Sequence, residues 1–127
     1  RYYQVHAAAR TAVPAEHLAF LNALPLHYET DDYIFVHAGI RPDVALAAQT
    51  ERDLLWIREP FLSHSAPRAK MIIHGHTALE APQLYSNRLN LDGGAGYGRP
   101  LTPVVIDNKQ IFCLGAHGRV LLEQSAL

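Results

Sequence analysis

MIIHGHT, at residues 71–77, is the stretch on which the fold depends, because an apolar run there ends abruptly in histidines. Met71 to Ile73 are consecutive apolar residues bounded by a turn signal, a pattern that favours a short buried strand over a helix. Gly75 lets the backbone turn and leaves His74 and His76 displayed where the strand ends. Ligands gather at strand ends in open α/β sheets, so the stretch predicts a central strand and a candidate site.

A second stretch, YIFVHAG at residues 33–39, repeats this design with His37 at the end of an apolar run. Two histidines at strand ends in one small domain favour a shared metal site, with His37 and His76 as ligands. Neutral imidazole binds Zn, Mn and Fe well, and the glycine neighbours leave room for an ion. The alternative is that each histidine is an ordinary hydrogen-bonded residue that never meets a metal.

Length and composition restrict the class of protein. The 127 residues form one domain at most, 49% of them are hydrophobic, and the formal net charge is −1. This balance argues against disordered tails and nucleic-acid binders. No run approaches the roughly 18 apolar residues of a membrane helix, so neither nucleic acid nor a membrane is expected as a partner. The single cysteine, Cys113, fits a buried position in a reducing compartment, and we expect a cytoplasmic protein.

The remaining pattern predicts an α/β fold in which short helices feed a mixed sheet. We expect helices over residues 1–11 and 14–24, the second with an apolar face, and one helical turn over 43–48. A further helix begins at the N-cap Thr50, continues through Arg58 and breaks at Pro60. Strands are expected at 26–29, 33–37, 71–73, 83–86 and 88–92, a tight glycine loop at 93–98, and an antiparallel meander at 101–106, 110–114 and 119–123.

Two arginines and one acid are candidates for further roles at the site. Arg58 follows an apolar helical face, and its planar fork suits two phosphate oxygens. The alternative for Arg58 is a surface salt bridge with Glu59 or Asp53. Arg41, in the loop after His37, is a weaker candidate of the same kind. Asp92, at the end of a predicted strand, is expected to hold either the glycine loop or a histidine.

Four motifs occur in order: VHAGIRP at 36–42, LLWIR at 54–58, IHGHT at 73–77 and LDGGAGYGRPLT at 91–102. Together they resemble the C-terminal half of bacterial serine/threonine protein phosphatases of the phosphoprotein phosphatase family, which are calcineurin-like metallophosphoesterases. The resemblance runs from about Pro14 to Val120. It implies that residues 1–127 are one partial domain, the C-terminal portion of the calcineurin-like metallophosphoesterase sandwich.

The resemblance also implies roles for individual residues. His37 and His76 would bind one ion of a dinuclear centre, with manganese as the first choice and iron or zinc as the others. Arg58 would clamp the substrate phosphate. His74 matches no ligand position, and we expect it to contact the ligand residues rather than the ion. Tyr97 matches a loop that flanks the cleft. Gly93 stands where the family usually has threonine.

Three motifs of the family lie upstream of these, GDxHG, GDxxDRG and GNHE, and none occurs in this chain. They supply the second ion's ligands, another phosphate-binding arginine and the catalytic histidine that protonates the leaving oxygen. We therefore expect no catalytic residue here, a metal centre that is incomplete or empty, and negligible activity without the N-terminal half of the same domain. Apolar surface that the missing half would cover is expected to favour self-association.

The activity implied is metal-dependent hydrolysis of phosphomonoesters on serine, threonine or tyrosine, with a phosphoprotein or phosphopeptide as substrate. One alternative is a dinucleoside tetraphosphate hydrolase of the same superfamily, since such enzymes also carry HAGI. A second is a non-catalytic relative that recognises phosphoproteins. A third is a structural domain without any metal.

Overall fold

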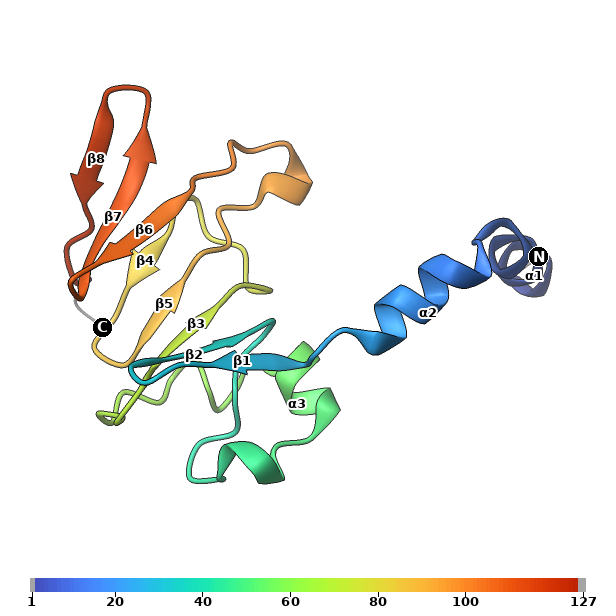
Figure 1. Cartoon of the computed structure of the whole chain (residues 1–127), viewed down its shortest axis with the longest axis horizontal. Coiled ribbons are helices and arrows are strands. Elements are labelled where there is room, and N and C mark those ends of the chain that lie inside the picture. Colours follow the sequence, from blue (N-terminus) through green and yellow to red (C-terminus); the bar gives the residue numbers. More distant parts are fainter. Residues whose placement is uncertain (1, 126–127) are drawn as a thin grey trace.

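The computed structural model describes residues 2–125, which form two sheets, a few short helices and a projecting pair of helices (Figure 1). The helices are α1 (Tyr2–Ala12), α2 (Ala15–Ala23) and α3 (Glu51–Trp56), with 3₁₀ turns η1 (Leu46–Ala48) and η2 (Ala95–Tyr97). The strands are β1 (His27–Glu29), β2 (Tyr33–Val36), β3 (Met71–His74), β4 (Gln83–Leu84), β5 (Arg88–Asn90), β6 (Val104–Asp107), β7 (Gln110–Gly115) and β8 (Gly118–Leu121).

The larger sheet has the strand order β1-β2-β3-β5-β4 and is mixed. Strands β2, β3 and β5 run parallel, while β1 and β4 pair antiparallel at the two edges. The register places Phe35 beside Ile73 and Ile73 beside Leu89, so the three parallel strands end close together. The predicted mixed α/β sheet, with the 71–73 segment at its centre, is therefore confirmed.

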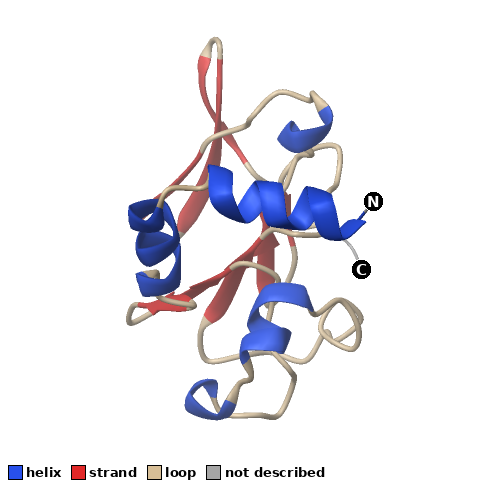
Figure 2. Cartoon of the chain, turned by 90° about the vertical axis from the view of Figure 1, so that its right-hand side faces the viewer, coloured by secondary structure: helices blue, strands red, loops and turns tan. Residues whose placement is uncertain are grey.

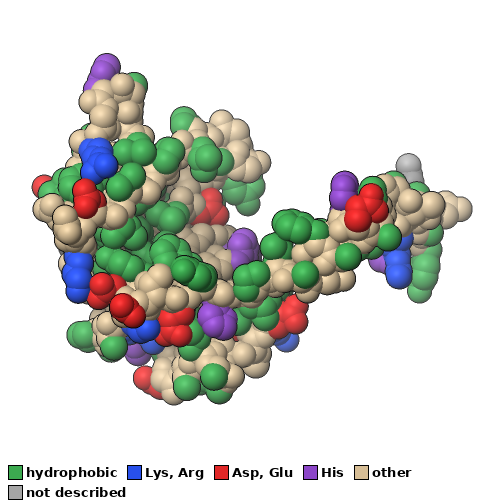
Figure 3. Space-filling model, viewed as in Figure 1, with side chains coloured by type: hydrophobic (Ala, Val, Ile, Leu, Met, Phe, Trp, Pro, Cys, Tyr) green, Lys and Arg blue, Asp and Glu red, His purple; other side chains and the backbone are tan. Residues whose placement is uncertain are grey.

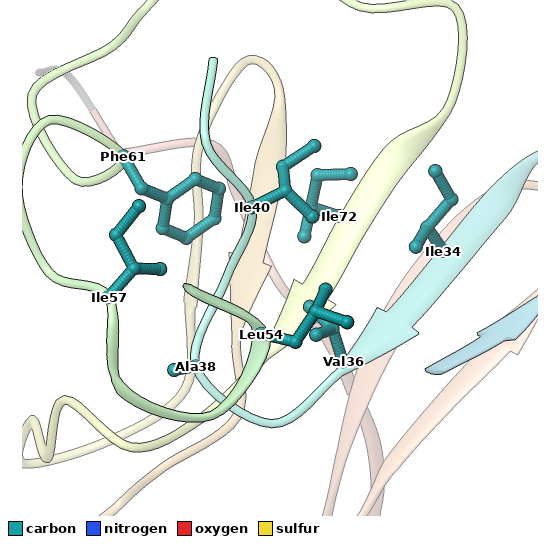
Figure 4. Close-up of a cluster of buried hydrophobic side chains, with 8 residues drawn as sticks. All are labelled: Ile34, Val36, Ala38, Ile40, Leu54, Ile57, Phe61 and Ile72. Atoms are coloured by element: carbon teal, nitrogen blue, oxygen red, sulfur yellow. The ribbon is translucent and has the colours of Figure 1, made fainter. Parts of the chain in front are cut away.

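One face of this sheet is covered by α3 and the loop that follows it. Apolar side chains from the sheet, from the loop after β2 and from the α3 region interlock there, and Phe61 is only 2% exposed (Figure 4). Full burial of a Val, Leu, Ile or Phe side chain contributes about 1.5–3 kcal/mol. The cluster consists of Ile34, Val36, Ala38, Ile40, Leu54, Ile57, Phe61 and Ile72.

The opposite face packs against the second sheet, an antiparallel β6-β7-β8 meander. A second apolar cluster joins the two sheets through Ile73, Leu89 and Ile111, which are all at most 3% exposed. The predicted C-terminal meander is confirmed. Cys113, on β7, is only partly buried, so the expectation of a buried thiol holds in part, and burial raises its pKa.

Helices α1 and α2 form an arm that projects from the body of the molecule (Figures 1 and 3). Figure 2, seen from the side of the arm, shows the strands gathered in the body behind it. Both helices were predicted, although Arg1 lies outside the described residues. The expected apolar face of α2 is not packed, since Leu18, Phe20 and Leu21 are 45–64% exposed. Self-association through apolar surface stays a prediction.

Several element boundaries differ from expectation, and two of them bear on the site. The helix that begins at Thr50 ends at Trp56 rather than Arg58, because Ile57 is already extended. Pro60 disfavours helical backbone at Glu59, so the segment after Ile57 cannot rejoin the helix. Strand β5 ends at Asn90, which leaves Asp92 in the following loop. Within residues 2–125, no helix combines the length and apolar character that crossing a bilayer requires.

Candidate functional site

The carboxyl ends of β2, β3 and β5 bring the predicted site residues to one edge of the sheet. His37 follows β2, His76 follows β3, and Asp92 follows β5. All three line a hollow of about 610 Å³. Figure 3 shows histidine and acidic side chains in the recess between the body and the arm. Parallel strands concentrate polar loops at such an edge, which explains why residues far apart in sequence meet here.

His37 and His76 lie next to each other. Their ring centroids are 5.1 Å apart and the rings are tilted by 59°. Two imidazoles whose nitrogens both lie about 2.1 Å from one ion have centroids roughly 4.5–5.3 Å apart for ligand angles near 90–110°. The Gly75 N–H also donates to the His37 carbonyl over 2.9 Å, which ties the two strand ends together. The spacing therefore fits a shared cation.

His76 has the features of an available ligand. Among the described residues its buried Nε2 has no hydrogen-bond partner. Desolvation, reinforced by the nearby charge of Arg58, lowers the pKa of His76, so the ring is neutral near pH 7. Its backbone is left-handed, with φ at 65°, a conformation that is costly for a non-glycine residue. The rings of Trp56 and His76 are nearly perpendicular, with their centroids 5.7 Å apart.

His74 lies behind the site rather than in it. It is 2% exposed and meets the Phe61 ring edge-on at 4.9 Å. Its Nδ1 lies 3.1 Å from the Gly75 carbonyl oxygen. Burial lowers the pKa of His74 to about 4, so this ring is also neutral at pH 7. The position accords with a supporting role, which stays a prediction.

Asp92 organises the glycine loop. Its Oδ1 accepts from the Gly94 N–H at 2.9 Å, and its own N–H donates to Asn90 Oδ1 at 2.9 Å. Its Oδ2 lies 3.9 Å from the position that a Cβ on Gly75 would take, so the carboxylate also borders the histidines. Of the two roles expected for Asp92, the structure shows the contact with the glycine loop.

His76 also lines a second cleft, of about 450 Å³. Its lining is cationic and polar, and Arg58 is exposed there. Within residues 2–125 Arg58 forms no ion pair, neither with Glu59 nor with Asp53. Its guanidinium is thus free for an anion. The residues that line this cleft are Arg58, His76, Thr77, Ala78, Tyr97 and Arg99.

Arg41 is engaged elsewhere. Its Nε and Nη2 donate to the two carboxylate oxygens of Asp53 at 3.1 and 2.7 Å. This contact lowers the pKa of Asp53 and raises that of Arg41. Thr50 caps α3 by accepting from the Asp53 N–H at 3.1 Å, as its position predicted. Arg41 thus fastens the loop after β2 to α3, and the phosphate role expected for it has no support in this arrangement.

Sequence reasoning assigned no role to Arg99, Thr77 or Trp56, yet all three border His76. The signal for Arg99 was its place directly after the glycine loop, GAGYGR, but a sequence does not show the direction in which such a loop folds. Trp56 was considered only as part of the predicted helix and of the LLWIR motif. Its exposure of 67% marks it as a rim residue of the site.

The metal-ligand set within residues 2–125 is small. No group of three or more His, Cys, Asp or Glu side chains there is arranged to hold an ion. The two histidines thus stand as a pair, with Asp92 nearby and hydrogen-bonded to the glycine loop.

Comparisons with protein-family models, with curated proteins and with solved structures gave no match for this chain.

Proposed function

We propose that this chain carries part of a metal-dependent phosphomonoester hydrolase site, of the kind found in calcineurin-like protein phosphatases. The observation that carries the proposal is the pairing of His37 and His76 beside an unpaired arginine, Arg58, within the described residues. Paired imidazoles suit a divalent ion, and a free guanidinium fork suits the oxygens of a phosphate. His76 borders both the hollow and the cleft, so ion and phosphate would be neighbours.

His37 and His76 would hold manganese in the first instance, with iron or zinc as the other candidates. A bound divalent ion lowers the pKa of water and offsets charge on phosphoryl oxygens. Within residues 2–125 the Nε2 of His76 has no hydrogen-bond partner, which is consistent with a role as a ligand to such an ion. Arg58 would hold and orient the phosphate, and Asp92 would keep the glycine loop in place beside the histidines.

The proposed centre needs more ligands than these residues provide, because a two-metal site requires bridging carboxylates or amides. We therefore propose that the N-terminal half of the same domain completes the centre and supplies the catalytic histidine. Its substrate would be a phosphoprotein or phosphopeptide. The 127 residues alone are expected to show negligible hydrolysis of an aryl phosphate with manganese present.

The test joins these 127 residues to a segment that carries the three upstream motifs. Hydrolysis of an aryl phosphate and a phosphoserine peptide is measured with manganese, alongside the variants His76→Ala, Arg58→Ala and Arg119→Ala. Loss of a metal ligand is expected to cost about 100-fold or more in turnover. Arg58→Ala should act mainly through KM, because it removes a binding contact, and Arg119→Ala should change neither constant.

Robust turnover by the 127 residues alone would contradict the proposal, as would full activity of the His76→Ala variant. A parallel assay with diadenosine tetraphosphate separates the two hydrolase classes. Faster cleavage of the tetraphosphate than of the phosphopeptide would move the assignment to the dinucleoside tetraphosphate hydrolases. Metal and phosphopeptide binding without any turnover would instead indicate a binding relative.

A further inference from the structure

The cleft beside His76 contains hydrogen-bond donors without any carboxylate. Its polar side chains are two guanidiniums, Arg58 and Arg99, the Tyr97 phenol, the Thr77 hydroxyl and the His76 imidazole. Within residues 2–125 no acidic side chain lines it. A cleft with two cations and no anion attracts anionic ligands, and its volume falls within the range of small-molecule sites. Arg58 alone is enough to bind one phosphate group, so the presence of Arg99 in the same cleft needs an explanation.

Arg99 is held in position. Its Nη1 donates to the Leu79 carbonyl at 2.7 Å, and the Leu79 N–H donates to the Asp92 carbonyl at 2.8 Å. A Cβ on Gly94 would lie 2.8 Å from Arg99 Nη1 and 3.0 Å from its Cδ, so the guanidinium can rest on this loop only because Gly94 has no side chain. The left-handed φ of 78° at Gly94 suits glycine as well. Four of the five N–H donors of Arg99 remain for a ligand.

Thr77 lines the same cleft and has a hydroxyl that is unsatisfied within residues 2–125. Its Oγ1 is buried and has no hydrogen-bond partner among the residues described. A buried hydroxyl without a partner costs free energy, which a ligand oxygen would recover. Tyr97 is 82% exposed at the rim, where its phenol is free to donate.

We infer that Arg99, with Tyr97 and Thr77, binds a second anionic group of the substrate, next to the phosphate that Arg58 holds. This inference rests on the proposed function, which assigns the first phosphate to Arg58. It names the substrate class more closely: a phosphate ester that carries a neighbouring carboxylate or phosphate. A guanidinium fork binds either group, so both sources share the same chemistry.

The test uses the 127-residue chain without metal. Trp56 is the only tryptophan in the sequence and its ring lies 5.7 Å from that of His76, so its fluorescence reports on anions in the cleft. The probes are inorganic phosphate and pyrophosphate. We expect pyrophosphate to bind about tenfold more tightly, because its second phosphate group offers oxygens to Arg99 while the first is held by Arg58.

Arg99→Gln should abolish the preference for pyrophosphate and leave phosphate affinity within about twofold. The matched control is Arg119→Gln, which removes the same charge from β8, where Arg119 pairs with Asp107 at 3.0 Å. Tyr97→Phe, at an exposed position that cannot disturb the core, should reduce the preference without abolishing it. Thermal unfolding of each variant shows that the chain is folded.

Phosphoserine peptides with a neighbouring aspartate or asparagine identify the source of the second anion. Tighter binding of the aspartate peptide assigns a carboxylate, and a preference confined to pyrophosphate assigns a phosphate. Equal affinities for phosphate and pyrophosphate, or equal effects of Arg99→Gln and Arg119→Gln, would overturn the inference. Because these titrations contain no metal, their outcome does not depend on manganese binding, and failure of the metal proposal is recognised separately in the activity assays.

Discussion

Two loops border the site, and they are packed in opposite ways. The loop after β2, residues 38–42, begins with three residues that are buried, and the Ala38 N–H donates to the Leu54 carbonyl at 2.9 Å. The glycine loop after β5, residues 93–98, is buried only at its first two positions and then exposed, with Tyr97 at its tip. The core therefore fixes the loop that carries on from His37, whereas the loop beside Arg99 is open to solvent. A metal ligand needs fixed geometry, and a substrate contact needs access.

The largest contrast between the two loops is expected on adding one methyl group. A Cβ on Gly39 would overlap the Phe61 ring, with Cε1 at 2.6 Å, and Phe61 cannot yield because it is buried. Gly39→Ala should therefore lower the free energy of unfolding by about 3 kcal/mol. Gly96→Ala is the matched control, since a Cβ there meets nothing within 4 Å. Urea denaturation measures both, and equal losses would show that the loops are not packed differently.

A smaller effect is expected where α3 supports the loop after β2. Thr50→Ala removes the cap that accepts from the Asp53 N–H, and should cost about 1 kcal/mol of the free energy of unfolding. Thr11→Ala, on the projecting arm, removes a hydroxyl that contacts only the Ala7 carbonyl of its own helix among the described residues. Its cost should stay within about 0.5 kcal/mol. A larger loss at Thr11 than at Thr50 would contradict this ranking.

The smallest effect concerns the acid dependence of stability. The Arg41 contact lowers the pKa of Asp53 in the folded chain, so the unfolded chain binds the proton first as pH falls. The contribution of the pair is present above the unfolded pKa, near 4, and is lost as pH falls through the lower folded value. Arg41 is half exposed, which keeps the contribution small. Asp53→Asn should flatten this part of the pH profile in chemical denaturation, whereas an unchanged profile would show that the pair does not fasten the loop.

Much of the fold was predictable because its signals are local. Apolar runs bounded by turns identified β2 and β3, and hairpin turns identified the β6-β7-β8 meander. Thr50 was recognised as a cap from its spacing to Asp53. The convergence of His37 and His76 followed from a single rule, that parallel strands end at the same edge of a sheet.

The rest depended on tertiary contacts, which a sequence does not display. Arg41 and Arg58 look alike in the sequence as arginines near the site. Within residues 2–125, however, Arg41 pairs with Asp53 and Arg58 forms no ion pair. The role of Arg99 depends on the path of the glycine loop over the sheet edge. The apolar residues of α2 predicted packing that is not found in the described chain, because periodicity indicates which face could pack and not whether a partner lies there.

The most direct test of the central claim, that His37 and His76 share one cation, is a manganese titration of the 127-residue chain followed by Trp56 fluorescence. We expect quenching that saturates only at high manganese, because two histidines are an incomplete ligand set and Trp56 lies against His76. The quenching should be lost in His37→Ala and in His76→Ala, and retained in His117→Ala, which alters the exposed turn between β7 and β8. Quenching that is the same in all three variants would contradict the claim.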